Sequence, residues 1–176
     1  VSCFADGKAP ILFSEYTPLW PSKDKIPDFQ EHQKSYRDEL KAPPKGIEVY
    51  MPHLEWYAPQ ENAPTNDTCV ILVSGGSYNS WCDGYWVDVA AKRFLAKGVT
   101  CVSLVYRTPR PKNLPIYKTA WQDGQRAVRI VRSQAEKRGY SPDKIGVLGF
   151  SAGAHLTVLL ATSSMTPSYD KIDDID

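Results

Sequence analysis

A serine with a glycine two residues away on each side is the first feature of the sequence that points to chemistry. Gly149-Phe150-Ser151-Ala152-Gly153 fits the pattern G-x-S-x-G, in which the serine hydroxyl can act as a nucleophile. Alone the pattern is weak evidence, because a chain of this length meets it by chance in roughly 6% of cases at ordinary glycine and serine frequencies. Its context is stronger, since an apolar strand-like run precedes it directly and a helix-like segment follows. The sequence therefore predicts Ser151 as a catalytic nucleophile.

The spacing of this motif has a steric explanation. A serine on a sharp strand-to-helix turn has a strained backbone, and only small residues fit two positions before and after it. The following helix points its free N–H groups and positive dipole end at the reacting atoms. We therefore expect the N–H of Ala152 to be one donor of an oxyanion hole. The alternative is a glycine-rich turn whose serine is incidental.

A second glycine-rich segment, Ser74-Gly75-Gly76-Ser77-Tyr78, follows an earlier apolar run. Loops in this position supply the other oxyanion donor, and the backbone N–H groups of Gly76 and Ser77 are the candidates. No lysine follows as a phosphate-binding P-loop would require. Three aromatic residues in and after this loop are candidate substrate contacts: Tyr78, Trp81 and Tyr85.

The two loops need a sheet to bring them together, and apolar runs that alternate with segments of helical periodicity predict one. The predicted order is strand 69–73, helix 84–97, strand 99–106, helix 120–135, strand 145–148 and helix 152–161. Three successive strand-helix units imply an α/β fold with a mostly parallel sheet and helices on both faces. Residues 1–46 are interpreted as an N-terminal arm on the surface, with a short polar helix at 28–40. Residues 47–57 suit a strand pair at a sheet edge.

The composition excludes several classes of protein. The chain is 42% hydrophobic and 23% charged, with a net charge of +1, as expected of a folded domain. Basic and acidic residues are mixed along it, which argues against a nucleic-acid partner and favours a small molecule. No apolar run approaches the roughly 18 residues of a membrane span. The four cysteines lack metal-ligand spacing, and Cys69 and Cys101 are expected to be small buried hydrophobes.

Several features together resemble the secreted acetyl and feruloyl esterases of the α/β-hydrolase superfamily, which act on side groups of plant polysaccharides, close to the hormone-sensitive-lipase branch. Besides the two loops they are Pro18-Leu19-Trp20-Pro21, Val105-Tyr106-Arg107 with Pro111 and Pro115, Asp123, and Ala154-His155. The resemblance covers nearly the whole chain, and the serine motif is its sharply specific part. The glycine segment departs from the HGGG or PGGGY pattern at Ser74 and Ser77.

This resemblance implies a serine carboxylic ester hydrolase that forms an acyl-enzyme on Ser151, needs no metal or other cofactor, and is secreted or periplasmic. Its substrates would be short acyl or aryl esters of carbohydrates. Residues 47–176 would be the N-terminal part of the hydrolase domain. Arg107 and Asp123 would form an internal ion pair, because a buried arginine needs such a partner.

The catalytic base is not evident in the sequence. His155 stands one helical turn past Ser151, a poor position for a general base, and no histidine follows it. In this fold the triad acid and histidine come after the serine, whereas the acidic run Asp170, Asp173, Asp174 and Asp176 follows too closely and is interpreted as a solvated loop. We therefore expect a missing C-terminal part of roughly 100 or more residues, or a companion chain, to supply both groups.

Two other functions stay open. A prolyl-oligopeptidase-like serine peptidase shares the serine motif but would need an extra domain to restrict access. A non-catalytic hydrolase-like fragment or binding module would explain the missing base. Against this last alternative, a strained serine turn beside a Gly-Gly loop is hard to explain in a protein that does no chemistry.

Overall fold

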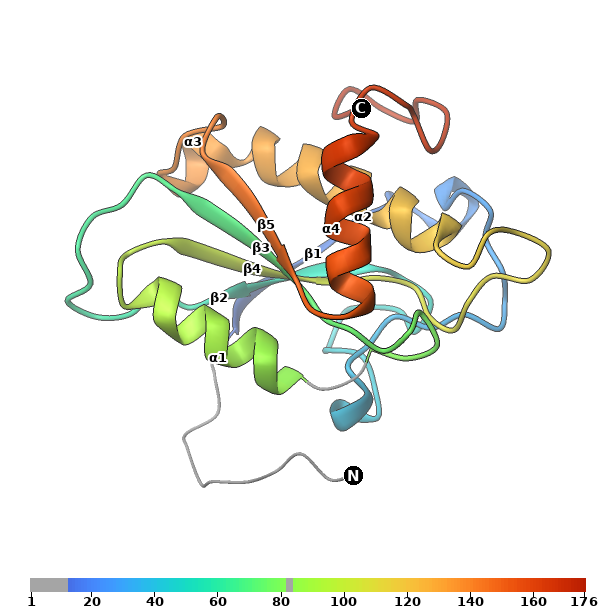
Figure 1. Ribbon diagram of the computed structural model, residues 1–176, viewed down its shortest axis with the longest axis horizontal. Coiled ribbons are helices and arrows are strands. Elements are labelled where there is room, and N and C mark those ends of the chain that lie inside the picture. The colour runs from blue at the N-terminus through green and yellow to red at the C-terminus, as the bar shows by residue number, and fades with distance from the viewer. Residues whose placement is uncertain (1–12, 82–83) are drawn as a thin grey trace.

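The computed structural model describes residues 13–81 and 84–176, which form a five-stranded sheet with helices on both sides (Figure 1). The strands are β1 (Phe13–Pro18), β2 (His53–Tyr57), β3 (Cys69–Val73), β4 (Thr100–Val105) and β5 (Ile145–Gly149). Their order across the sheet is β1-β2-β4-β3-β5. The predicted α/β class with a mostly parallel sheet is confirmed, since β1, β3, β4 and β5 run in the same direction and only β2 runs antiparallel to its neighbours.

The helices follow the parallel strands as the sequence predicts. They are α1 (Gly84–Leu95), α2 (Lys118–Ser133), α3 (Ala135–Arg138) and α4 (Ala152–Thr162). In Figure 1, α1 lies below the sheet, and α2 and α3 lie above it. Helices α2 and α4 pack closely where Gly124 meets the side chains of Leu156 and Leu160. None of the described helices combines the length and the apolar character that crossing a bilayer would require.

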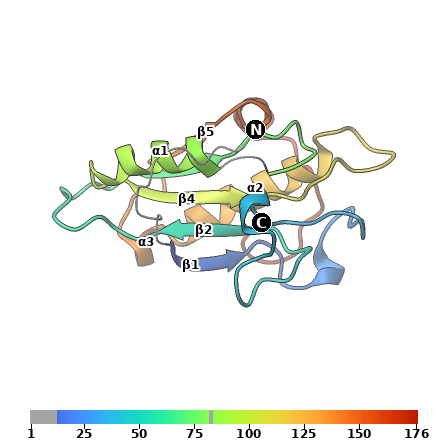
Figure 2. The same ribbon diagram turned by 90° about the horizontal axis from the view of Figure 1, so that it is seen from below.

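The N-terminal segment differs from the interpretation as a surface arm. Strand β1 pairs antiparallel with β2, so β1 rather than a segment within 47–57 completes the sheet edge (Figure 2). Leu19 and Trp20 are buried at 1% exposure and therefore belong to the core. The predicted helix at 28–40 is wrong, because this range holds only the 3-10 turn Asp38–Leu40.

Backbone hydrogen bonds to distant segments explain why residues 28–40 are not helical. The N–H and C=O groups of Lys34 both bond to Thr108, and the N–H of Ser35 donates to the carbonyl of Val49. Groups committed to such partners cannot also join the i to i−4 ladder of a helix. Long-range pairing has overridden local propensity here.

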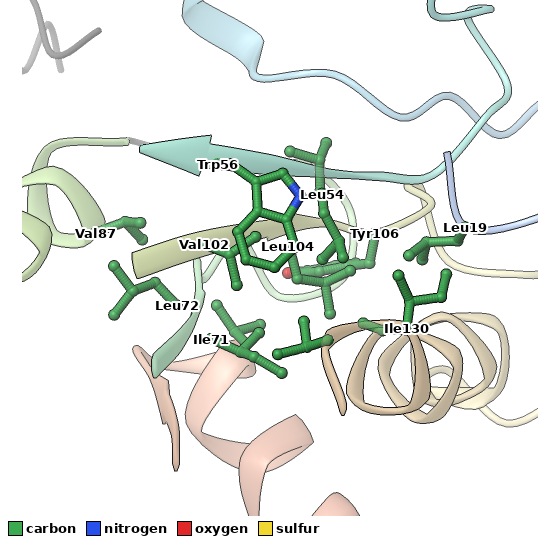
Figure 3. Close-up of a cluster of buried hydrophobic side chains, with 14 of the residues drawn as sticks. Leu19, Leu54, Trp56, Ile71, Leu72, Val87, Val102, Leu104, Tyr106 and Ile130 are labelled. Carbon is green, nitrogen blue, oxygen red and sulfur yellow. The ribbon is translucent and has the colours of Figure 1, made fainter. Parts of the chain in front are cut away.

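The core lies between the sheet and the helices (Figure 3). Its central side chains come from the inner strands, with Val87 contributed by α1 and Ile130 by α2. Cys69 and Cys101 are free thiols at 0% exposure. Their interpretation as small buried hydrophobes is confirmed.

Candidate functional site

Ser151 lies on the turn between β5 and α4, at the carboxyl end of the parallel strands (Figure 1). Its backbone has φ 52° and ψ −117°, a region that residues with a side chain rarely adopt and that costs on the order of 1–3 kcal/mol. The residue is exposed to solvent. This turn therefore presents a hydroxyl outward at a point where the chain is strained.

The glycines on either side of Ser151 are required by contacts with backbone atoms. A Cβ added to Gly149 would lie 2.1 Å from the carbonyl oxygen of Gly153, and one added to Gly153 would lie 2.3 Å from that of Val73. Neither contact involves a flexible side chain that could move aside. These distances agree with the steric explanation drawn from the sequence.

Helix α4 begins directly after the serine. The carbonyl of Phe150 accepts from the N–H of Gly153, and the carbonyl of Ser151 accepts from that of His155. Ala152 is the first residue of the helix, so its N–H has no acceptor within the helix. An anion next to Ser151 would meet this N–H and the positive end of the helix dipole.

Residues 74–78, which we call the glycine loop, lie directly against Ser151. Strands β3 and β5 are neighbours with Val73 opposite Gly149, so the segments that follow them leave the sheet side by side. A Cβ on Gly75 would lie 3.0 Å from Cβ of Ser151 and 3.6 Å from its Oγ. Gly75, which was not among the candidate site residues predicted from the sequence, therefore lies beside the serine.

The glycine loop has an unusual backbone. Gly76, Ser77 and Tyr78 have φ values of 122°, 53° and 61°, so two residues with side chains occupy the left-handed region in succession. The carbonyl of Gly76 accepts from the N–H groups of Asn79 and Ser80, at 2.9 and 3.2 Å. Because the N–H of a trans peptide points opposite to its C=O, these bonds turn the N–H of Ser77 away from Asn79 and Ser80.

A hydrogen bond from outside the loop also holds this segment. The Nε of Arg110 donates to the carbonyl of Ser77 at 3.0 Å. Arg110 itself is exposed, so it ties the loop to the segment after β4 from the solvent side.

The three candidate aromatic contacts occupy different environments. Tyr85 is 46% exposed on α1, where its ring packs edge-on against that of Trp86, which is 56% exposed. Tyr78 is buried, and burial raises the pKa of its hydroxyl to about 12. Trp81 is fully buried, and its indole N–H donates to the carbonyl of Leu104 at 3.0 Å. Trp81 therefore packs in the core, and Trp86 is an exposed aromatic residue that the sequence analysis did not select.

Each histidine has a partner other than Ser151. Nδ1 of His155 is hydrogen-bonded to the hydroxyl of Tyr78 at 2.8 Å. The ring of His53 is fully buried with Nδ1 3.0 Å from the carbonyl of Met51. Nε2 of His32 lies 3.1 Å from the carbonyl of Arg110. Within residues 13–81 and 84–176 no hydrogen bond joins a histidine to the Ser151 side chain.

Arg107 and Asp123 form an ion pair in the interior, with Nη2 and Oδ1 2.9 Å apart and both side chains at 0% exposure. The backbone N–H of Arg107 also donates to Asp123, at 2.9 Å. The indole N–H of Trp20 donates to the same carboxylate at 3.0 Å. This network ties the N-terminal segment, the end of β4 and helix α2 together.

The acidic run near the end of the chain is only partly solvated, so its interpretation as a solvated loop is wrong for two of its members. Asp173 and Asp176 both pair with Arg126 of α2, and the Asp176 side chain is 3% exposed. Asp170 and Asp174 are exposed. Across the described part of the chain, this acidic run included, no cluster of three or more potential ligands could hold a metal ion.

Comparisons with known proteins find one matching family and relatives named as a xylanase and as esterases. The sequence matches the BD-FAE family over residues 54–174. It is 28% identical over 135 residues to an endo-1,4-beta-xylanase B from Butyrivibrio fibrisolvens. The aligned region covers 77% of this chain and 21% of that protein. The sequence is also 28% identical over 96 residues to an acetylxylan esterase from Xylanibacter ruminicola, in an alignment that covers 54% of this chain and 19% of that protein.

A solved structure with similar architecture is that of an acetyl ester-xyloside bifunctional hydrolase from Caldicellulosiruptor lactoaceticus. Its sequence identity is 28% and the TM-score is 0.66, over 95% of this chain and 53% of that one. The chain thus spans about a fifth of the curated relatives that it matches.

Proposed function

Since the chain belongs to the BD-FAE family of α/β-hydrolases, we propose that it is a serine carboxylic ester hydrolase whose nucleophile is Ser151. The observation that carries this proposal is the close approach of the glycine loop to Ser151, since a Cβ added to Gly75 would lie only 3.6 Å from the serine Oγ. An exposed, strained serine at a helix N-terminus, close to a glycine-rich loop, is an arrangement that acyl transfer uses. A binding module would gain nothing from the strain.

In the proposed mechanism, Oγ of Ser151 attacks the carbonyl carbon of the ester while a base removes the hydroxyl proton. The carbonyl oxygen becomes an oxyanion, which the N–H of Ala152 and the N–H of Gly76 or Ser77 stabilise. The base then protonates the departing alcohol. Water hydrolyses the acyl-enzyme by the same steps in the second half of the reaction. This chemistry uses no metal or other cofactor.

We place the base and the triad acid in polypeptide outside residues 1–176, in a C-terminal part or a companion chain. The support is that all three histidines are engaged elsewhere. A serine hydroxyl without an adjacent base is a weak nucleophile. His155 in particular is committed to Tyr78.

Short acyl or aryl esters on carbohydrates are the proposed substrates. Two observations support them: the relatives named as an acetylxylan esterase and a xylanase, and the exposed rings of Tyr85 and Trp86. Aromatic rings offer flat apolar faces with a polar edge, which suit sugars and small acyl groups. A secreted or periplasmic location fits substrates of this kind.

The experiment is labelling with a fluorophosphonate probe, together with p-nitrophenyl acetate and acetylated xylan as substrates. We expect the full-length native protein to be labelled and to hydrolyse both, and Ser151→Ala to lose labelling and activity. Ser163→Ala, at the other end of α4, is the matched control and should behave like the parent.

Labelling of Ser151→Ala at the parental rate would exclude this nucleophile. A folded native protein that is never labelled would favour the non-catalytic alternative. Cleavage of peptides or long-chain triglycerides, without cleavage of acetyl esters, would contradict the substrate class.

A further inference from the structure

The side chain of Tyr106 is hydrogen-bonded to the backbone of the glycine loop. It follows β4 directly and is fully buried. Its hydroxyl oxygen lies 3.1 Å from the carbonyl oxygen of Ser74 and 3.3 Å from that of Gly75. Because carbonyl oxygens only accept, the tyrosine is the donor, and its single proton is shared between two consecutive peptide groups.

These two bonds determine where the next two N–H groups point. In a trans peptide the N–H of one residue lies opposite to the C=O of the residue before it. Drawing the Ser74 carbonyl toward Tyr106 therefore turns the N–H of Gly75 away from Tyr106, and the bond to Gly75 does the same for the N–H of Gly76. Glycine peptides have little conformational preference of their own, so an outside contact has to select the orientation.

The orientation matters because Gly76 is a proposed oxyanion donor and the adjacent Gly75 lies so close to Ser151 that an added Cβ would be 3.0 Å from the serine Cβ. A peptide flipped by half a turn would present its carbonyl oxygen where its N–H had been, and would repel an oxyanion instead of stabilising it. Preorganised donors are effective because they need no rearrangement during the reaction.

The sheet places the Tyr106 hydroxyl rigidly. Arg107, the next residue, is anchored by its buried ion pair with Asp123. The Tyr106 ring packs edge-on against that of Tyr78, with centroids 6.0 Å apart. We propose that Tyr106 is a positioning residue that fixes two consecutive peptide groups of the glycine loop and so orients the N–H of Gly76 for the oxyanion, an inference that rests on the proposed esterase function.

The test is Tyr106→Phe in the full-length protein, which removes one hydroxyl and keeps the ring. The control is Tyr140→Phe, because the Tyr140 hydroxyl is also buried and donates to a backbone carbonyl, that of Val131 at 2.6 Å, but touches neither the glycine loop nor Ser151. We expect Tyr106→Phe to lower kcat for p-nitrophenyl acetate by about 10- to 100-fold with little change in KM. Labelling by the fluorophosphonate should slow in parallel. Both variants should lower the thermal midpoint by similar amounts, but Tyr140→Phe should leave kcat unchanged.

Replacing Tyr106 by 4-aminophenylalanine gives a second measurement, because its amino group keeps a donor near the position of the hydroxyl. We expect it to restore most of kcat. If Tyr106→Phe does not fold, 4-fluorophenylalanine replaces it, since fluorine fills much of the hydroxyl's space without donating.

The outcomes separate the two proposals. A native protein that neither hydrolyses esters nor reacts with the probe removes the proposed function and this inference together. An active native protein in which Tyr106→Phe retains kcat as Tyr140→Phe does, or changes KM alone, overturns only the inference. The same holds if the aminophenylalanine protein folds but stays as slow as Tyr106→Phe.

Discussion

Gly146 and Gly149 belong to the same strand, β5, but differ completely in what surrounds them. A Cβ on Gly149 would meet the backbone of Gly153 at 2.1 Å, whereas a Cβ on Gly146 would meet no atom within 4 Å. Gly149→Ala should therefore destabilise the protein by about 1–3 kcal/mol or more. Gly146→Ala should be neutral or slightly stabilising, because alanine restricts the unfolded chain. Urea unfolding of the two variants checks this, and equal losses of stability would show that the turn around Ser151 is not sterically locked.

Individual residues were predictable from the sequence where local sterics or chain order decides their place. The serine motif is such a case, because the turn itself demands small neighbours. Trp81 is the opposite case. Proximity to the glycine loop suggested a substrate contact, but the succession of positive φ values at Gly76, Ser77 and Tyr78 bends the chain back and directs Trp81 into the core. Such a change of direction cannot be read from residue types.

The segment after α4 is held to α2 by charge, which links two elements far apart in sequence. Arg126 bonds to Asp173 over 47 residues and also pairs with Asp176 at 3.0 Å. The sequence shows an acidic run but not the arginine that contacts it, so the sequence alone favours a solvated loop. Amphipathic periodicity located α2 correctly, but it cannot identify which distant side chains an arginine on that helix will contact.

The contact between Asp173 and Arg126 predicts a stability that depends on pH. Hydrogen bonding to Arg126 holds the pKa of Asp173 below its ordinary value of 3.8. A carboxyl whose pKa is lower in the folded state stabilises the fold above its unfolded pKa, and that contribution disappears as the pH falls through the folded value. Asp173→Asn should therefore lower the thermal midpoint at pH 7 and have little effect well below pH 3.8.

Asp174→Asn is the matched control, because Asp174 is exposed and its Oδ1 lies 3.8 Å from Nζ of the exposed Lys171. This variant should change the midpoint little at either pH, since such surface pairs contribute little. A constant difference between Asp173→Asn and the parent across the whole pH range would refute the electrostatic origin.

For the molecule as a whole, strand order brings the two loops of the site together. Strand β3 lies between β4 and β5, so the glycine loop leaves the sheet beside the Ser151 turn. Buried apolar runs and crossover rules predicted a parallel sheet. They did not predict that the N-terminal segment would supply β1. The apolar pattern of a strand shows that the strand is buried, but it does not indicate which other strand will pair with its edge.

The two cysteines in the central strands should report the opening of this sheet. Cys69 of β3 and Cys101 of β4 have no solvent exposure, and burial raises the pKa of each thiol to about 12. Only the thiolate reacts with disulfide reagents, so at pH 8 both groups should be inert in the folded protein. They should become reactive over the same urea range in which the circular dichroism signal is lost, because central strands open only with global unfolding. The measurement uses a protein carrying Cys3→Ser and Cys82→Ser, which removes the two cysteines outside the described residues. Complete reaction within minutes in the absence of urea would mean that β3 and β4 separate locally, and would contradict a single cooperative sheet.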